Sequence, residues 1–200
     1  MGLAALIVIF SDIYTEHMKV TILAVGLLLF LVPTGCRRDT DTTGSVRSEV
    51  LVPFKVSVSE ARSLTLFEGP PHQFWEAEEL KKELSQKPTV QLHGFPFYEQ
   101  TLAVEPRDAS KLKVLFLSAE TFHLYPAGVV HVKQCGGFHP DYVVRWTTGD
   151  RVYDVLICFG CEEARCYGPC REVYCDISPA AFKEFESTLT PYRRSRPLKQ

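Results

Sequence analysis

The sequence predicts an α+β fold, a mostly antiparallel sheet with about three helices, preceded by an apolar N-terminal segment. Helix-like and strand-like patterns come in blocks along the chain instead of alternating strictly, which excludes a Rossmann or α/β-barrel architecture. The chain has 200 residues, 46% of them hydrophobic and 12% aromatic, which is enough for one hydrophobic core. We therefore expect one domain, over residues 50–192, behind the N-terminal segment.

The first part of this domain shows two short strand patterns and one helix pattern. Residues 54–58 alternate apolar and polar side chains, as a half-buried strand does, and residues 64–67 predict a second strand before the turn at 68–71. Residues 73–86 predict a helix, because apolar side chains recur at helical spacing while charged ones fill mainly the other face. The expected inward stripe of that helix is Phe74, Ala77, Leu80 and Leu84.

The middle of the domain adds a strand and a second helix. Residues 89–92 predict a strand that runs into the bend 93–97, where Gly94 and Pro96 are expected to break regular pairing. A helix is expected to start at Pro106 and to end near Ser118, because proline suits a first helical turn. Its expected inward side chains are Leu112, Leu115 and Phe116.

The C-terminal part is rich in β-branched and aromatic residues. Residues 129–132, 142–146 and 151–157 predict strands, and the turn at 147–150 predicts a hairpin between the last two. Residues 173–175 predict a further edge strand.

A third helix is expected after Ser178, which caps it. Its expected inward stripe is Ala181, Phe182, Phe185 and Leu189, and Pro191 follows its end. The basic residues 193–200 are expected to be a solvated tail without a function of their own.

The charge balance argues against nucleic acid as a partner. The chain carries 22 Lys and Arg against 24 Asp and Glu, so no overall positive field exists to hold a phosphate backbone.

The N-terminus has the layout of an export signal. Val20–Val32 is an uncharged run of 13 residues that follows Lys19, and Met18 is an alternative true start. A membrane-spanning helix needs about 20 apolar residues, so this run is short for a permanent span. Residues 1–36 are therefore interpreted as a signal peptide or anchor, and the polar residues 37–49 as a flexible tether.

Thr34-Gly35-Cys36 after a leucine-rich run resembles the cleavage and lipidation site of bacterial lipoproteins. The resemblance implies that Cys36 becomes the acylated first residue and holds the protein at a membrane of the cell envelope. The sequence departs from the pattern in one place, because Pro33 stands where the family usually has leucine. The alternatives are an uncleaved anchor helix and ordinary secretion.

The remaining six cysteines all lie within 41 residues of the domain. They are Cys135, Cys158, Cys161, Cys166, Cys170 and Cys175. If Cys36 carries lipid, these six can pair completely in an oxidising compartment, in a connectivity that the sequence does not define. Cys166, Cys170 and Cys175 are expected to staple the loop that contains them.

Two other uses of the cysteines stay open. Cys135, His139, Cys158 and Cys161 form a candidate zinc site, because the expected hairpin brings three thiolates and one imidazole together. The Cys158-Phe159-Gly160-Cys161 segment also resembles the CxxC of thiol-disulfide oxidoreductases, although it lies in a β-hairpin pattern.

The other candidate polar residues lie in bends. His72, His93 and His139 are each expected to hydrogen-bond or pack within a turn, and Asp141 is placed to orient His139. No nucleophile elbow, phosphate loop, HExxH or haem-attachment motif is present in the sequence.

The segments EGPPHQ, HGFPFYE, CGGFHPDY and CFGC, together, are similar to a group of small, uncharacterised bacterial lipoproteins over residues 64–196. The resemblance implies a location in the cell envelope and a shared fold, without a mechanism. We therefore expect a non-enzymatic, membrane-anchored domain outside the cytoplasm that binds an envelope protein or another ligand. The alternatives are a thiol oxidoreductase that uses Cys158 and Cys161, and a zinc-binding domain.

Overall fold

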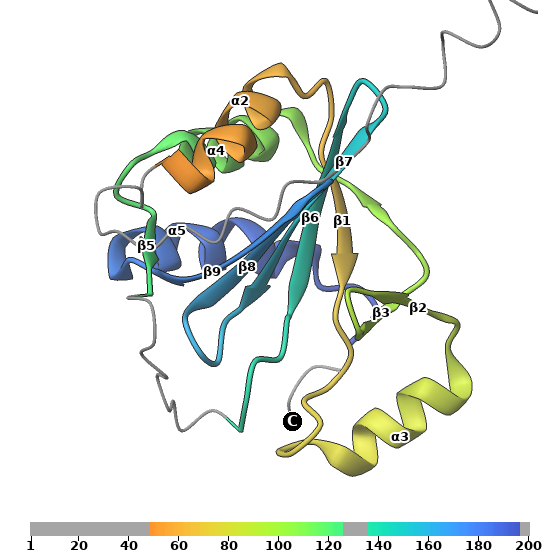
Figure 1. The fold of residues 1–200 in the computed structure, drawn as a ribbon. Helices are drawn as coiled ribbons and strands as arrows, with labels where there is room; N and C mark the ends of the chain where they lie inside the picture. The colour runs from red at the N-terminus through yellow and green to blue at the C-terminus, as the bar shows by residue number, and fades with distance from the viewer. Residues whose placement is uncertain (1–48, 126–135, 197–200) are drawn as a thin grey trace, which may run out of the picture. The chain divides into compact units, whose positions relative to one another are not determined.

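The computed structural model describes residues 49–125 and 136–196, which form an α+β fold (Figure 1). These residues contain four α-helices and a mostly antiparallel sheet of seven strands, so the expected fold class is confirmed. The helices are α2 (Val52–Glu60), α3 (Ala77–Gln86), α4 (Pro106–Leu117) and α5 (Pro179–Leu189), with short 3₁₀ helices η1 (Glu49–Leu51) and η2 (Thr190–Tyr192). None of these described helices has the length and apolar character that crossing a membrane requires.

The strands form two sheets. They are β1 (Thr65–Glu68), β2 (Thr89–Leu92), β3 (Phe95–Tyr98), β4 (Leu102–Ala103), β5 (Phe122–Leu124), β6 (Tyr142–Thr148), β7 (Arg151–Cys158), β8 (Glu163–Gly168) and β9 (Arg171–Ile177). The large sheet has the order β4-β1-β6-β7-β8-β9-β5, and β2 pairs with β3 in a separate hairpin. Strands β6 to β9 follow one another as antiparallel neighbours, so the centre of the sheet is a meander of local hairpins.

Most of the expected elements are present. The strand at 64–67, the hairpin of β6 and β7, the helix from Pro106 and the helix capped by Ser178 are all confirmed. The Ser178 side chain accepts a hydrogen bond from the backbone N–H of Ala181 at 3.4 Å, as an N-cap does. The expected strand at 129–132 lies outside the described residues, as do Cys36 and Cys135.

The strand expected at 54–58 is wrong, because these residues belong to helix α2. Phe54, Val58 and Ala61 are buried and recur at spacings of four and three, so one side of a helix faces the core. Lys55, by contrast, reaches a carbonyl outside the helix. The period-2 alternation was therefore misleading, and packing against the sheet overrides the β propensity of the valines.

The break expected at 93–97 is also wrong, because this segment contains a tight hairpin. Leu92 pairs with Phe95, which leaves His93 and Gly94 as a two-residue turn with φ angles of 53° and 84°. Two positive φ values define a type I′ turn, whose twist matches that of paired strands. Pro96 is accommodated because β3 pairs only with β2 in this small sheet.

Strand β8 was not expected from the sequence. Its segment Glu163–Gly168 has no β-branched residue, yet it pairs with β7 on one side and β9 on the other. Gly168 pairs with Arg171, so the loop that was expected to need cysteine staples is a tight hairpin. Backbone hydrogen bonds to strands on both sides hold this segment as a strand, although its amino-acid composition did not indicate one.

Helices α2, α4 and α5 cover one face of the large sheet and bury the main core (Figure 1). Alternate strand residues point to this core, and the residues between them point to the opposite face. The opposite face packs a second cluster against the β2–β3 hairpin: Phe67, Phe97, Phe138, Val143, Leu156, Cys158 and Cys161.

A helix was expected at 73–86, but α3 begins only at Ala77. The expected apolar stripe of this segment does not face the core. Phe74 is 64% exposed and Leu84 is 42% exposed, whereas Glu83 is buried. The Glu83 carboxylate accepts a hydrogen bond from the Tyr98 hydroxyl at 2.5 Å and pairs with Lys87 at 2.7 Å. The helix therefore docks through a polar contact, while Leu84 stays in solvent and Leu80 is only partly buried.

Candidate functional site

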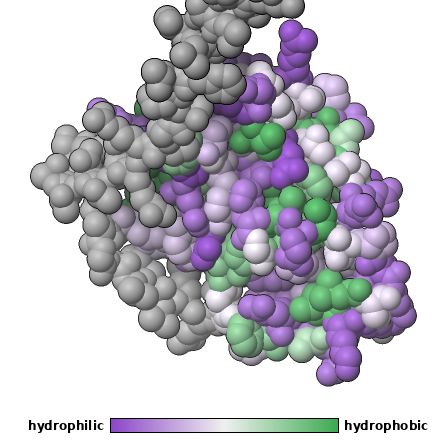
Figure 2. All heavy atoms as spheres, turned by 45° about the vertical axis from the view of Figure 1, so that its right-hand side comes forward, coloured by the Kyte–Doolittle hydropathy of each residue, from purple (hydrophilic) through white to green (hydrophobic). Residues whose placement is uncertain are grey.

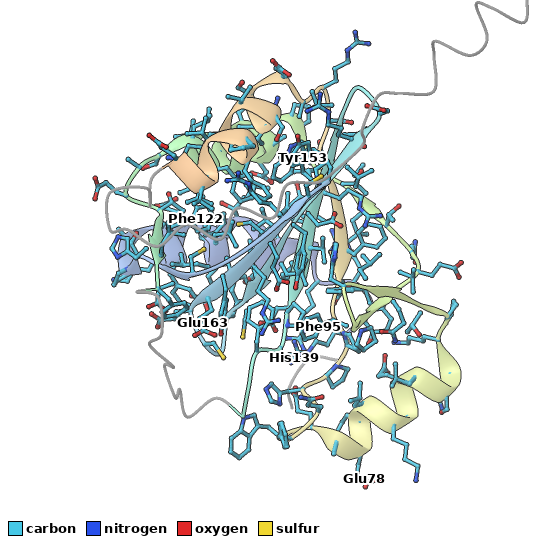
Figure 3. All side chains as sticks on the ribbon, viewed as in Figure 1. Glu78, Phe95, Phe122, His139, Tyr153 and Glu163 are labelled. Atoms are coloured by element: carbon cyan, nitrogen blue, oxygen red, sulfur yellow. The ribbon has the colours of Figure 1, made fainter. Side chains whose placement is uncertain are left out.

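Three of the four segments noted in the sequence meet at one end of the sheet, which we call the motif end (residues 68–76, 136–142, 158–162 and 193–196). His139 contacts the carbonyl of Pro70 through its Nε2 at 3.0 Å, and the Gly69 N–H donates to the carbonyl of Asp141 at 2.8 Å. The Asp141 carboxylate accepts the N–H of Phe159 at 2.7 Å. The fourth segment contributes Phe95, whose ring lies edge-on to that of Phe138. Figure 3 labels His139 at this end.

Close backbone packing at the motif end requires a glycine at position 69. A Cβ atom there would lie 2.2 Å from the carbonyl oxygen of Pro140, which is well inside van der Waals contact. The segment after β1 can therefore lie directly on the segment before β6.

His72 caps the helical turn that leads into α3. Its Nδ1 accepts the N–H of Phe74 at 3.1 Å and the N–H of Trp75 at 3.4 Å. In return, the Glu76 carboxylate accepts the N–H of His72 at 2.9 Å, a reciprocal arrangement like a capping box. The His72 ring also lies against the His139 ring, with centroids 4.6 Å apart.

Residues 193–200 were expected to be a solvated tail. This expectation is wrong for residues 194–196, which are bonded to the rest of the domain. The Glu68 carboxylate is buried and accepts the backbone N–H groups of Arg194, Ser195 and Arg196 at 3.0, 2.7 and 2.9 Å. Lys87 also donates to the carbonyl of Ser195 at 2.6 Å. A carboxylate that receives three amide donors is a strong anchor, which charge counting along the sequence could not reveal.

Arg196 joins three segments of the motif end. Its Nη1 bonds Asp141 at 2.5 Å and its Nη2 bonds Glu76 at 2.7 Å, and the side chain is only 12% exposed. Because Glu76 also holds His72, the C-terminal segment fixes the turn before α3.

At the tip of this fixed turn, Phe74 and Trp75 are 64% and 69% exposed. We call these two residues the aromatic tip. Figure 2 shows that the surface on the α3 side carries apolar patches set among hydrophilic residues.

Cys158 is the last residue of β7 and Cys161 lies in the turn between β7 and β8, and both are buried, at 1% and 4% exposure. Burial raises the pKa of the Cys158 thiol to about 11, although the N–H groups of His139 and Cys161 point to its sulfur and act in the opposite direction. A redox nucleophile needs a lowered thiol pKa and access to its substrate. These two properties of Cys158 do not favour the oxidoreductase alternative.

Complete pairing of the six cysteines is not what the structure shows. Cys158, Cys166 and Cys175 are free thiols, and all three are buried. Cys166 and Cys175 lie in the main core on neighbouring strands, where a hydrogen bond between them and burial raise the pKa of Cys175. Cys161 and Cys170 each have a partner and are not free.

The backbone N–H groups of His139 and Cys161 lie at the Cys158 sulfur, so these three members of the candidate zinc site are neighbours. The fourth member, Cys135, lies outside the described residues. Within the described residues, no group of three or more His, Cys, Asp and Glu side chains is arranged to hold a metal ion. Burial lowers the pKa of His139 to about 4, so its ring is neutral near pH 7. Its Nε2 is engaged with Pro70 rather than with the sulfur of Cys158.

A second polar cluster surrounds His93 on the β2–β3 hairpin. His93 Nε2 bonds the buried carboxylate of Asp154 at 2.7 Å, and Arg145 holds the same carboxylate with two hydrogen bonds of 2.7 and 2.8 Å. The His93 ring is stacked on Tyr167 at 3.7 Å between centroids. Sequence analysis placed His93 in a bend but did not detect Asp154 as its partner, because they are 61 residues apart.

A hollow with a volume of about 530 Å³ lies elsewhere in the described residues. Its lining is Glu60, Arg62, Ser63, Thr65, Arg145, Trp146, Thr147, Thr148 and Gly149. It is open and polar, unlike the enclosed apolar pockets that usually hold small ligands.

The fold and the motif end together define an α+β domain with a rigidly supported aromatic tip. Comparison of this chain with family models, with curated proteins and with solved structures finds no match.

Proposed function

We propose that this chain is a lipoprotein of a bacterial cell envelope, held at the membrane through Cys36, whose domain binds a partner protein through the aromatic tip. The export layout of Val20–Val32 and the Thr34-Gly35-Cys36 segment support the anchoring. The aromatic tip supports the binding role.

The observation that carries the proposal is that two large aromatic side chains are exposed on a backbone that is tightly held. The amides of Phe74 and Trp75 are bonded to His72, and Arg196 holds Glu76 in place. Exposed apolar rings alone are common on protein surfaces. Aromatic residues dominate the binding energy of protein interfaces, and a fixed backbone lowers the entropy lost on binding.

The chemistry of the motif end supports binding rather than catalysis. The Cys158 thiol and the His139 imidazole are neutral near pH 7. The charged side chains of Arg196, Glu76 and Asp141 are engaged with one another. A reacting group would need a free lone pair or a lowered thiol pKa at an accessible position. The large apolar groups exposed at this end are the rings of the aromatic tip.

Site-specific photo-crosslinking in the producing cells tests the binding role. A photoreactive phenylalanine analogue replaces Trp75 in the full chain, and crosslinked products are separated and identified by mass spectrometry. We expect one dominant protein product, which is lost when Phe74→Ala is added because half of the tip is then missing.

The matched control places the same analogue at Val152, an aliphatic residue of β7 with 45% exposure. Position 152 should give no such product. Identical products from positions 75 and 152, or none from position 75, would contradict the proposed binding surface.

A further inference from the structure

Two free thiols of the described residues lie next to each other in the main core. Cys166 belongs to β8 and Cys175 to β9, which are adjacent antiparallel strands (Figure 1). The register pairs Cys166 with Val173 and, two positions along β9, Cys175 with Ala164, so the cysteines are diagonal neighbours. Both side chains point into the main core and therefore lie on the same face of the sheet. Diagonal neighbours on one face are close enough for their side chains to interact.

The two sulfur atoms are already in contact. A hydrogen bond joins the thiols of Cys166 and Cys175, and the Cys175 thiol also donates to the carbonyl of Ala164 at 3.6 Å. A disulfide needs an S–S distance of about 2.0 Å. Rotation of the two side chains and a small approach of the strands would bring the sulfurs to that distance. The register therefore suits a bond between these two strands.

The other free thiol of the described residues is not a partner for this pair. Cys158 belongs to the second cluster, on the opposite face of the sheet. The strands themselves separate it from Cys166 and Cys175, which belong to the main core. A bond within the main core therefore joins Cys166 to Cys175 and leaves Cys158 reduced.

The folded core protects the pair from reagents. The hydrogen bond with Cys166, together with burial, raises the pKa of the Cys175 thiol, whereas the species that attacks a disulfide is a thiolate. Both side chains are also closed to solvent, with 1% and 0% exposure. The bond should therefore form only when the strands separate.

Strand β9 lies where a sheet opens most easily. Its outer neighbour β5 has three residues and forms the edge of the large sheet. On its inner side β9 is joined to β8 by a tight turn, because Gly168 pairs with Arg171. Opening from this edge lets a reagent reach both thiols. The tight turn then returns the strands to the same register, with the two sulfurs again in contact.

We propose that Cys166 and Cys175 form a reversible disulfide that locks β9 onto β8 when the chain meets a disulfide oxidant. The structure is the reduced form of this latch. The inference does not use the aromatic tip, and it rests on the proposed export only for the place where the oxidant is met, since compartments outside the cytoplasm are oxidising. The bond holds β9, the strand that leads into α5, against local opening.

The reaction is thiol–disulfide exchange, with a small-molecule or protein disulfide as the oxidant. The Cys166 thiolate attacks one sulfur of the oxidant, whose S–S bond breaks and releases a first thiolate. The Cys175 thiolate then attacks the Cys166 sulfur of this mixed disulfide, and the second thiolate leaves. The two protons given up by the cysteines end on the two thiols of the reduced oxidant, which has taken up two electrons.

Oxidation of the full chain with oxidised glutathione tests the proposal. The chain is purified without reductant, incubated with oxidised glutathione in urea below the unfolding transition, then unfolded and alkylated with iodoacetamide. Peptide mapping by mass spectrometry compares the chain before and after oxidation. We expect Cys166 and Cys175 to change from labelled to linked, while Cys158 stays labelled. Dithiothreitol should restore the labelling of all three.

Two rates test the role of strand opening. Because opening limits access to the thiols, the bond should form about tenfold faster in mild urea than without urea. Once the bond has formed, the amides of β9 should exchange with solvent about tenfold more slowly than in the reduced chain. Unchanged exchange of β9 after oxidation would overturn the latch, because the bond would then hold nothing in place.

Two alanine variants are matched controls, since each removes one buried free thiol. Cys158→Ala should oxidise as the unaltered chain does. Cys175→Ala should give no internal link and should leave Cys166 labelled or joined to glutathione. Circular dichroism melting curves verify that both variants are folded. If Cys175→Ala does not fold, the linked peptides of the Cys158→Ala variant decide the test.

The remaining outcomes also decide the proposal. Mixed disulfides with glutathione at Cys166 or Cys175, in place of the linked peptides, would overturn it, because the sheet would then keep the sulfurs too far apart to join. A link from either cysteine to Cys158, or labelling of all three after oxidation, would overturn it as well. None of these outcomes bears on the binding role, which the crosslinking at position 75 tests separately.

Discussion

Some titratable side chains of the motif end are buried, and for His139 this burial makes the stability of the fold depend on pH. Its ring is buried beside His72 and Pro70, and burial lowers its pKa from the ordinary 6.5 to about 4. The unfolded chain therefore takes up a proton at a higher pH than the folded chain does. Stability linked to this group is present above about pH 6.5 and is lost as the pH falls toward 4.

We expect the free energy of unfolding to fall by about 2 kcal/mol between pH 7 and pH 5 because of His139. His139→Gln keeps an N–H for the Pro70 carbonyl but cannot be protonated, so its pH dependence should be flatter by that amount. Urea unfolding of both proteins at the two pH values provides the comparison. Equal slopes would show that His139 is not the titrating group.

A second prediction for single residues concerns the buried thiols. Cys158, Cys166 and Cys175 are free, and their burial should protect them from alkylation in the native protein. In urea without reductant, all three should react with iodoacetamide, as counted by mass spectrometry. Fast labelling of Cys158 in the folded protein would instead indicate the accessible thiolate of an oxidoreductase.

Sequence reasoning found some residues of the motif end and missed others for a physical reason. His72, His139, Asp141 and Cys158 stood out because their types or neighbouring glycines and prolines are distinctive. Arg196 is one of several arginines in a basic stretch, and its partners lie 55 and 120 residues away. Only the folded chain brings those charges together.

At the scale of elements, hairpins and helices depend on different signals. The expected hairpin of β6 and β7 was found because Gly149 marks its turn, where φ is 63°. The β2–β3 hairpin was missed although His93-Gly94 stands between two apolar segments, since Gly94 and Pro96 were interpreted as a break in regular pairing. Helix α2 was missed because residues 54–58 fit a strand and a helix equally well over so short a span.

The type I′ turn at His93 predicts an order of mutational effects. His93→Val should destabilise the domain by about 2–3 kcal/mol, because a β-branched residue is strained at positive φ and the bond to Asp154 is lost. His93→Asn should cost only about 1 kcal/mol, since asparagine adopts this conformation readily. Urea unfolding ranks the two. Equal losses would mean that the turn conformation contributes little.

The hydrogen bonds between the Glu68 carboxylate and residues 194–196 predict the effect of removing the charge of Glu68. Glu68→Gln should destabilise the fold by about 2–3 kcal/mol, because a buried carboxylate that accepts three amide hydrogen bonds is replaced by a group that is partly a donor. Glu78→Gln, at an exposed position of α3, is the matched control and should change little. A loss equal to that of the control would show that residues 194–196 do not stabilise the fold.

For the whole molecule, the fold class was predicted correctly from the sequence. The prediction depended on strands and helices occurring in blocks, and a wrong assignment of one element does not change that pattern. Helix α2 in place of a strand, and the unexpected strand β8, still gave helices packed on an antiparallel sheet.

Hydrogen exchange at the amides of residues 72–76 decides whether the aromatic tip is held in one position. If the His72 cap and the Arg196 ion pairs fix this turn, its bonded amides exchange slowly in the full chain even though Phe74 and Trp75 are exposed. Arg196→Gln should make the same amides exchange at least about tenfold faster. Rapid exchange in the unaltered chain, or no change in the variant, would contradict a preorganised binding surface.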